Sequence, residues 1–317
     1  MVLPTFQDVK KAASLLKDVA HQTPIHSSRQ LNEISQAMVF LKCENFQRVG
    51  AFKFRGAYNA VANLQSHKPV VALSSGNHAQ GVALACQLLR KEAHLVMPKP
   101  INPVKRAAVQ GYGGTVHTPG AHQDVEVYCH DLMETIQGEW VEAFNDPSVI
   151  AGQGTAALEF LQQVEDLDVI IAPIGGGGLL SGTSLAAHGI NPNIQIFACE
   201  PAGSLDAMYS IEENRIVPQD HPHTIAEGLR TSVGTLTLPI LREHLTGFFV
   251  VEEQEIIQAM RFVYERLKLV IEPASAVAIA PLLRQEPDLR DKRVGVIISG
   301  GNVDLSSYFD GLLNQEN

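Results

Sequence analysis

Two patterns of apolar and polar residues alternate along this chain. Short continuous apolar runs lie at 70–73, 93–98, 169–174, 194–200 and 293–299, and each is bounded by turn-forming or polar residues. Between them lie longer segments such as GVALACQLL and SGTSLAAHG, in which apolar residues recur at helical spacing. The short runs predict buried strands and the longer segments predict helices. Their repeated order predicts an α/β fold with mostly parallel, twisted sheets flanked by helices.

The beginning of the chain and its length bear on the number of domains. Residues 1–16 have the pattern of a loop followed by an amphipathic helix, without the basic, apolar and small-residue order of a signal peptide. No apolar run approaches the roughly 18 residues that span a bilayer. A chain of 317 residues more often forms two domains than one. Because no flexible linker is visible, we expect the chain to cross between the two domains more than once.

Composition and charge narrow the class of protein. Hydrophobic residues make up 45% of the chain, charged residues make up 18%, and the formal net charge is −10 without a cluster of lysines or arginines. This pattern is typical of an ordinary soluble protein and argues against nucleic acid or a membrane surface as a partner. No pair of cysteines has metal-finger or redox spacing, which favours a reducing, cytoplasmic location. The four are Cys43, Cys86, Cys129 and Cys199.

Three of the expected strands end in similar glycine-containing turns. These are SSGNH at 74–78, GGGGLLSG at 175–182 and SGGN at 299–302. Ligands of open α/β sheets bind beyond the carboxyl ends of the strands. Glycines there let backbone N–H groups approach an anion, and the following helix adds a favourable dipole. A single such turn is more often only a tight turn, but three together favour a ligand site.

The residues exclude some ligands and favour another. No Gly-Lys-Ser/Thr follows the glycine run, so it is not a nucleotide P-loop, and it fits the dinucleotide fingerprint only loosely. Lys53 lies between two phenylalanines in AFKFRG. It is either a surface lysine that keeps its ammonium in water or a buried one whose pKa is lowered, which makes the amine nucleophilic. A phosphate-binding loop and a nucleophilic lysine together suggest pyridoxal phosphate.

Six ordered blocks make the chain resemble the serine/threonine dehydratases and serine racemases. The blocks are ENFQRVGAFKFRGA, SSGNHAQG, VIAGQGT, GGGGLLSG, IEPASA and SGGNVD, and the resemblance runs from about residue 5 to about residue 308. These are pyridoxal-phosphate enzymes of the tryptophan-synthase-β-like class, so the resemblance implies a two-domain, fold-type II enzyme. We expect a large cofactor-binding domain formed by 1–67 and 146–317, and a small substrate-closing domain formed by 68–145.

The resemblance implies a role for each matching residue at the cofactor. Lys53 forms the covalent bond to the cofactor and takes the substrate's α-proton, and Phe52 lies along the pyridine ring, although simple core packing also explains Phe52. Asn77 bonds the phenolic oxygen, and Ser299 faces the pyridine nitrogen. The phosphate lies on the backbone N–H groups of Gly175, Gly176, Gly177, Gly178 and Leu179.

The substrate side is less uniform within the family. The resemblance implies that Ser74, Ser75, Asn77 and His78 bind the substrate. Many threonine dehydratases read SAGNH, whereas this chain reads SSGNH as racemases do. The Ser75 hydroxyl could therefore return a proton on the face opposite Lys53, or it could only bind the carboxylate.

Other positions near the substrate depart from the racemase pattern. Phe144 stands where vertebrate-type racemases carry Asn, and it is preceded by Glu142-Ala143 in place of His-Pro. Glu126 falls near an arginine of several racemases, which argues against a substrate with a second carboxylate. Glu272 in IEPASA could tune a pKa or cap a helix.

The segment CEPAGSLDAMYS resembles a cation site of the racemases. The Glu200 carboxylate, the Ser204 carbonyl and the Asp206 carboxylate keep the family spacing and would bind Mg²⁺, Ca²⁺ or Mn²⁺ in a structural role. The alternative is an exposed acidic turn.

The resemblance implies an enzyme of small hydroxy amino acids. We expect a dehydratase, or ammonia-lyase, that converts L-serine or L-threonine to a 2-oxo acid and ammonia, with serine racemisation as a second activity. The enzyme would be a homodimer or a homotetramer. A dedicated serine racemase and a 3-hydroxyaspartate dehydratase are alternatives, and a non-catalytic amino-acid sensor is the alternative from another class.

Overall fold

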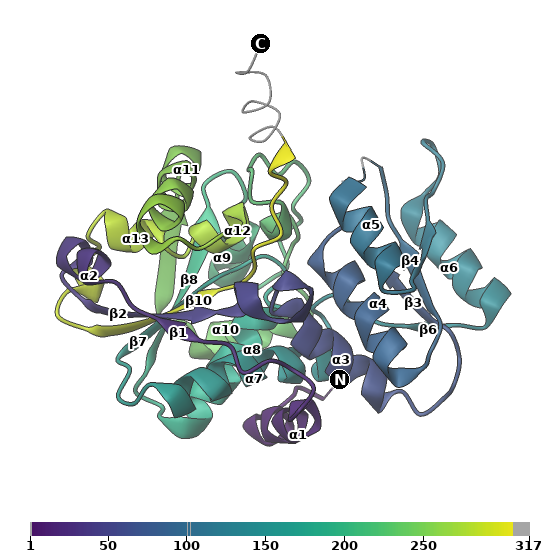
Figure 1. Ribbon diagram of the computed structural model, residues 1–317, viewed down its shortest axis with the longest axis horizontal. Helices are drawn as coiled ribbons and strands as arrows, with labels where there is room; N and C mark the ends of the chain where they lie inside the picture. Colours follow the sequence, from purple (N-terminus) through teal and green to yellow (C-terminus); the bar gives the residue numbers. More distant parts are fainter. Residues whose placement is uncertain (1, 100, 102, 307–317) are drawn as a thin grey trace, which may run out of the picture.

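The computed structural model describes residues 2–99, 101 and 103–306, and its strands form two separate sheets (Figure 1). The six-stranded sheet has the order β1-β2-β10-β7-β8-β9, and the four-stranded sheet has the order β5-β4-β3-β6. All neighbours are parallel except β1 and β2. The strands are β1 Ile25–His26, β2 Met38–Cys43, β3 Val70–Leu73, β4 Ala93–Val96, β5 Thr115–His117, β6 Glu139–Trp140, β7 Val169–Pro173, β8 Gln195–Pro201, β9 Gly247–Val251 and β10 Arg293–Ile298.

Helices cover both faces of each sheet. On the larger sheet, residues of α2, α11, α12 and α13 form the core of one face, and those of α1, α7, α8 and α10 form the core of the other. On the smaller sheet, α3, α4 and α5 pack on one face and α6 on the other. The helices are α1 Phe6–Leu16, α2 Arg29–Ser35, α3 Lys53–Asn63, α4 Asn77–Leu89, α5 Pro103–Gly111, α6 Val125–Ile136, α7 Pro147–Gln163, α8 Gly178–Ile190, α9 Asp206–Glu213, α10 Thr237–His244, α11 Glu253–Phe262, α12 Pro273–Ala276 and α13 Ala280–Leu283.

The expected α/β architecture is confirmed, and each of the five apolar runs forms a strand. The central strands β7 and β10 are buried on both faces, which is why their sequences are apolar without alternation. The sequence did not predict β1, β2, β5, β6 or β9. Of these, β1 and β6 have two residues each and carry too little pattern to be recognised.

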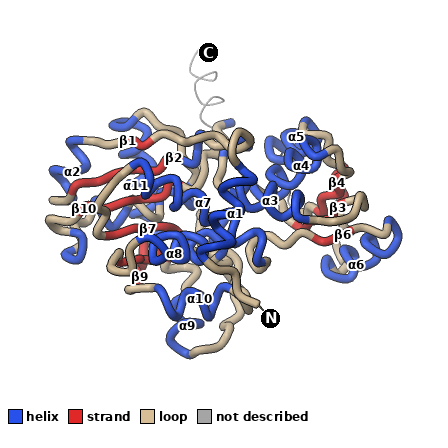
Figure 2. The backbone as a smooth tube through the Cα atoms, turned by 90° about the horizontal axis from the view of Figure 1, so that it is seen from below, coloured by secondary structure: helices blue, strands red, loops and turns tan. Residues whose placement is uncertain are grey.

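Helix α3 lies between the two sheets and packs against both α4 and α7 (Figures 1 and 2). The contact with α7 is made backbone to backbone, because a Cβ added at Gly152 would lie 2.6 Å from Gly56 Cα. Helix α7 meets α8 in the same way, since a Cβ added at Gly182 would lie 2.4 Å from the Ile150 carbonyl oxygen. The glycines of VIAGQGT and of the helical part of GGGGLLSG therefore set the spacing of three helices.

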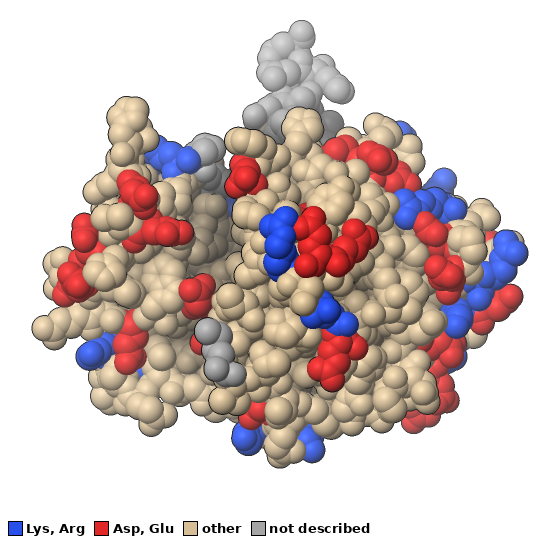
Figure 3. All heavy atoms as spheres, turned by 180° about the vertical axis from the view of Figure 1, so that it is seen from behind, with Lys and Arg blue, Asp and Glu red and all other residues tan. Residues whose placement is uncertain are grey.

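The helices and the surface of the molecule bear on whether it binds a membrane or a nucleic acid. Among the described residues, none of the helices is both long enough and apolar enough to cross a bilayer. On the face seen in Figure 3, basic and acidic side chains are interspersed, and the surface is hollowed between the two parts of the molecule. The four cysteines are buried free thiols.

Candidate active site

A cavity of about 670 Å³ lies where the carboxyl ends of strands from both sheets face each other. Its volume is within the usual range for small-molecule sites. All three glycine-containing turns contribute to its wall, so the structure brings together segments that are far apart in the sequence. The residues predicted for cofactor and substrate all line it: Phe52, Lys53, Ser74, Ser75, Asn77, His78, Phe144, Gly175, Gly176, Gly177, Gly178, Leu179 and Ser299.

Lys53 is the first residue of α3 and points its amine into this cavity. Nζ donates a hydrogen bond of 2.8 Å to the Ala143 carbonyl oxygen and lies 5.4 Å from the centre of the Phe52 ring. Burial lowers the pKa of Lys53 to about 8, although the negative charge of Glu272 opposes this shift. Near physiological pH most of the amine is still protonated, but the neutral, nucleophilic fraction is far larger than for a lysine with the ordinary pKa of 10.5.

The glycine loop joins β7 to the amino end of α8. Gly177 has φ +86°, a left-handed conformation that favours glycine, and it directly precedes the first residue of α8. The Phe144 ring packs so closely that a Cβ on Gly176 would lie 2.4 Å from it. The N–H groups of the first helical turn have no intrahelical partner, and together with the helix dipole they favour an anion.

In the SSGNH turn, only Ser75 is exposed. The neighbouring Ser74 hydroxyl accepts a hydrogen bond of 3.1 Å from the Gly76 N–H. His78 is 2% exposed, and burial, followed by the nearby charge of Lys53, lowers its pKa to about 3. His78 is thus a neutral imidazole, with Nε2 3.4 Å from the Val141 carbonyl oxygen. No described residue is a partner of its Nδ1.

Of the two roles expected for Glu272, the structure supports an effect on a pKa, that of Lys53, and not the capping of a helix. It precedes α12, but its side chain does not cap that helix. Its carboxylate instead accepts bonds of 2.8 and 3.0 Å from the Asn77 amide, whose oxygen accepts a bond of 2.9 Å from Asn302. Burial raises the pKa of Glu272. The Asn77 NH2 group has two N–H donors, so it could bond a cofactor oxygen with one of them and keep Glu272 on the other.

Ser299 lies at the end of β10 and is 3% exposed. Its hydroxyl is 2.9 Å from that of Ser275, and its carbonyl accepts a bond of 3.0 Å from the Phe52 N–H. The end of β10 is therefore tied directly to the residue before Lys53.

The three predicted metal ligands lie outside the cavity, at the end of β8 and the start of α9. The alternative of an exposed acidic turn is wrong, because Glu200 is 1% and Asp206 4% exposed. Burial raises the pKa of Glu200 to about 8 and that of Asp206 to about 6. Both Glu200 oxygens accept N–H bonds from α9, whereas Asp206 Oδ2 is buried without a partner among the described residues.

A cation would suit the Asp206 oxygen, because it is a buried acceptor that no described donor satisfies. The described part of the chain contains no cluster of three or more His, Cys, Asp and Glu side chains with metal-binding geometry. The two carboxylates and the Ser204 carbonyl would therefore need water to complete a shell of oxygen ligands.

Sequence reasoning missed several parts of the cavity wall. Lys105 and Glu227 form an ion pair of 2.6 Å, and the Ala143 carbonyl holds the reactive lysine. Neither role has a local sequence signal, because one depends on residues far apart and the other on a backbone atom. The expectation that Glu126 faces the substrate is wrong. Glu126 is exposed on the first turn of α6 and is not among the described residues that line the cavity.

Comparison with known proteins identifies the class. The sequence profile of the pyridoxal-phosphate-dependent enzymes matches residues 16–300. The chain thus belongs to this family, and its fold is that of the fold-type II members.

Three proteins of this family show which of its members the chain resembles. The chain is 44% identical to a serine racemase of Dictyostelium discoideum over 97% of each chain. It is 42% identical to an L-threo-3-hydroxyaspartate ammonia-lyase of Saccharomyces cerevisiae, over 97% of this chain and 96% of the relative. The crystal structure of a T.th. threonine deaminase superposes with a TM-score of 0.91 at 38% identity, over 96% of this chain and all of that chain.

The residues in the cavity fit pyridoxal phosphate. Lys53 supplies a primary amine with a lowered pKa, as attachment to an aldehyde requires. The glycine loop supplies an anion site without a side chain. An added Cβ at Gly76 would meet nothing within 4 Å, so open space lies beside the SSGNH turn.

The electrostatics of the cavity predict how Lys53 titrates. In cofactor-free protein, the rate at which an amine reagent labels Lys53 should rise with pH with a midpoint near 8, below that of exposed lysines. In Glu272→Gln the midpoint should fall further, because the negative charge that stabilises the ammonium is gone. Mass spectrometry of the labelled peptide gives the midpoint.

The matched control is Glu227→Gln, which removes a cavity carboxylate that is paired with Lys105 and should leave the midpoint near 8. An unchanged midpoint in Glu272→Gln would contradict the coupling between Glu272 and Lys53.

Proposed function

We propose that this enzyme removes water from L-serine and L-threonine, releasing ammonia and a 2-oxo acid, and that it also racemises serine. The observation that carries the proposal is the amine of Lys53, which is enclosed, has a lowered pKa and shares one cavity with the exposed Ser75 hydroxyl and the glycine loop. The relatives, among them a serine racemase and a threonine deaminase, support this range of substrates.

Each part of the cavity has a task in holding the cofactor. Lys53 would attach to it, the loop 175–179 would bind its phosphate, and Phe52 and Ser299 would hold its ring. When bound, pyridoxal phosphate supplies an electron sink for negative charge at the substrate's α-carbon. A hydroxyl at Ser299, in place of a carboxylate, would not hold a proton on the ring nitrogen, which would limit how far charge spreads and favour prompt elimination or reprotonation.

Two groups move the α-proton in this proposal. Lys53 Nζ takes it from one face, and the Ala143 carbonyl holds this amine in place. For racemisation, Ser75 Oγ returns a proton to the opposite face. His78 is neutral and has a single N–H, so it would donate to the substrate carboxylate only in the Nδ1–H tautomer, which gives up the long contact of Nε2 with the Val141 carbonyl.

The charge of the cavity favours a substrate with one carboxylate. Among the described residues that line it are the four carboxylates of Glu142, Glu227, Glu272 and Asp304 and the two ammonium groups of Lys53 and Lys105. A second substrate carboxylate would meet repulsion there. A 3-hydroxyaspartate ammonia-lyase remains the second candidate, because Lys105 lines the cavity and relatives with that activity are similar in sequence.

We also propose that residues 68–145 form a small domain that closes over the substrate. Lys105, on α5, and Glu227, which follows β8 in the larger part, meet across the cavity, so their ion pair would stabilise the closed arrangement. Closure would exclude water and strengthen the electrostatic interactions in the cavity.

One assay tests the reaction. Purified enzyme should form 2-oxo acid from L-serine and L-threonine faster than from 3-hydroxyaspartate, and should form some D-serine in the same tube. Lys53→Ala should abolish all products, whereas Lys10→Ala, a change far from the cavity, should not.

Activity that survives in Lys53→Ala would refute the assignment of the lysine. A preference for 3-hydroxyaspartate would favour the second candidate. A cofactor-loaded protein without turnover, whose absorbance changes with amino acids, would favour a sensor.

Ser75 separates the two activities. Ser75→Ala should lower D-serine formation by about 10²–10⁴-fold, the usual contribution of a general acid or base, and should change 2-oxo acid formation from L-serine little. Ser74→Ala is the matched control and should lower both rates together, because its hydroxyl shapes the turn. A parallel fall of both activities in Ser75→Ala would show that Ser75 only binds the carboxylate.

We propose that Glu200, Asp206 and the Ser204 carbonyl bind Mg²⁺ or Ca²⁺ and stabilise the fold. A ligand at a hundredfold excess over its Kd contributes about 2.7 kcal/mol, so either ion should raise Tm measurably and a chelator should reverse the rise. Asp206→Asn should abolish this response, and Asp288→Asn, at an exposed position, should keep it. If neither ion changes the Tm of the wild-type protein, the proposed metal site at Glu200, Ser204 and Asp206 does not exist.

A further inference from the structure

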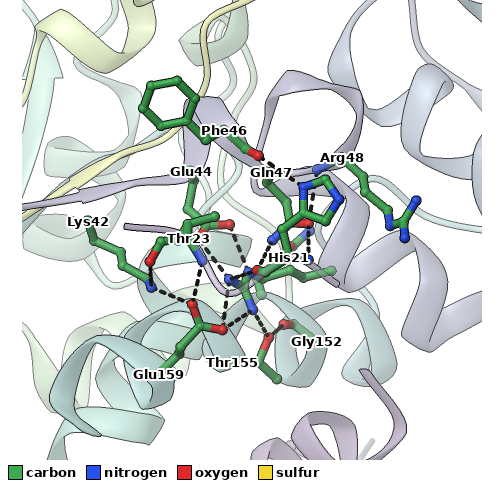
Figure 4. A network of polar contacts seen from close by, with 12 residues as sticks. His21, Thr23, Lys42, Glu44, Phe46, Gln47, Arg48, Gly152, Thr155 and Glu159 are labelled. Carbon is green, nitrogen blue, oxygen red and sulfur yellow. Dashed lines mark hydrogen bonds and ion pairs between the residues drawn. The ribbon is translucent and has the colours of Figure 1, made fainter. Parts of the chain in front are cut away.

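A cluster of buried charges includes the first turn of α3, and its members Lys42, Glu44 and Glu159 are labelled in Figure 4. It contains Lys42 on β2, Glu44 after β2, Arg55 on α3 and Glu159 on α7. The exposed fractions of the four side chains are 0%, 0%, 2% and 18%. Two positive and two negative charges balance, so the cluster as a whole is neutral. None of these residues lines the cavity or has a role in the proposed reaction.

Arg55 uses its entire guanidinium in the cluster. Nε and Nη2 donate bonds of 2.7 and 2.8 Å to the two oxygens of Glu44. Nη1 and Nη2 donate bonds of 3.1 and 3.2 Å to Glu159 Oε2. Further bonds reach Thr155 Oγ1 at 3.4 Å and the His21 carbonyl at 3.3 Å. A planar fork with five N–H donors can satisfy this geometry, whereas an ammonium cannot.

The hydrogen bonds of Lys42 and Glu44, two further members of the cluster, join the strands and helices around Arg55. Lys42 Nζ bonds Glu159, the Thr23 carbonyl at 2.9 Å and Gln163 Oε1 at 2.6 Å. The Thr23 hydroxyl donates a bond of 2.7 Å to Glu44, whose other bonds come from Arg55. The cluster thereby joins the chain before β1, the edge of the larger sheet, α3 and α7 into one unit.

Arg55 and Lys53 share the first turn of α3 but leave it in different directions. Residues two apart in a helix differ by about 200° around its axis, so Lys53 faces the cavity while Arg55 faces the cluster. The same turn also contacts the smaller part of the molecule: a Cβ on Gly81 of α4 would lie 3.3 Å from the Lys53 carbonyl oxygen. The turn that carries the reactive lysine is thus shared by both parts.

We propose that Arg55 is the positioning residue for Lys53: its bonds to Glu44 and Glu159 fix the first turn of α3 to the larger sheet. Lys53 then keeps its place relative to the glycine loop when the smaller part moves. The bond from the Phe52 N–H to the Ser299 carbonyl secures the other end of the turn. The proposal rests on the proposed function only in taking Lys53 as the reactive amine.

Arg55→Lys tests this role, since it keeps the charge but loses the fork. In cofactor-free protein, the labelling midpoint of Lys53 should shift upward from about 8 toward the ordinary 10.5, because a loosened turn exposes the amine. In loaded enzyme, kcat should fall by about tenfold or more while KM changes little, because a small misplacement of a reacting group is costly.

The matched control is Arg284→Lys, the same change in an ion cluster with Glu255 and Glu286 that lies away from the cavity. It should leave the Lys53 midpoint and kcat unchanged. If Arg55→Lys lowers Tm but matches this control in midpoint and kcat, the cluster only stabilises the fold and the proposal is wrong.

Glu159→Gln, at the more exposed end of the cluster, decides the question if Arg55→Lys does not fold. A raised midpoint would support the proposal, whereas a midpoint still near 8, or a second failure to fold, would overturn it. The midpoint is measured without cofactor or substrate. A protein that turns over none of the proposed substrates would therefore refute the proposed function without deciding the role of Arg55.

Discussion

The ion pair of Arg55 with Glu44 is the interaction on which the arrangement of the cavity depends. Removing such charges from water costs several kcal/mol for each ion, and only close geometry and further hydrogen bonds offset this cost. Here burial would raise the pKa of Glu44, but the charge and hydrogen bonds of Arg55 outweigh burial and hold that pKa below its usual value. Losing one partner of a buried pair typically costs about 3–5 kcal/mol. A change at Glu44 or Arg55 would therefore leave the buried charge of the other without this partner.

Two cations in one helical turn have opposite environments. Arg55 is surrounded by acceptors that raise its pKa despite burial, whereas Lys53 has one hydrogen bond, to a neutral carbonyl, and no ion pair within the described part of the chain. Burial without a counterion lowers the pKa of Lys53. The turn thus separates a permanently charged structural group from an amine that can lose its proton, and this separation is what a lysine nucleophile needs.

The sequence predicted those parts of the cavity that have a local sequence pattern or that match a motif of the family. Strand ends and glycine turns are local, and the position of Lys53 in AFKFRG followed from the resemblance to known enzymes. The Ala143 carbonyl could not be predicted, because any residue supplies the same atom. The partners of Arg55 and Lys105 lie up to 122 residues away and depend on packing. Glu126 was misplaced because no motif fixes the register of the segment before α6.

The glycine contacts between α3, α7 and α8 restrict how the molecule can move. Packed helices usually slide past one another by small changes in side-chain rotamers, which gives a shear motion. At Gly56, Gly152 and Gly182 no side chain separates the backbones, so sliding would drive one backbone into another. If the smaller sheet moves as proposed, α3, α7 and α8 would stay together, and the motion would have to be taken up at the contact of α3 with α4 and in the connections 64–69 and 141–146. The three helices would act as a rigid base for that motion.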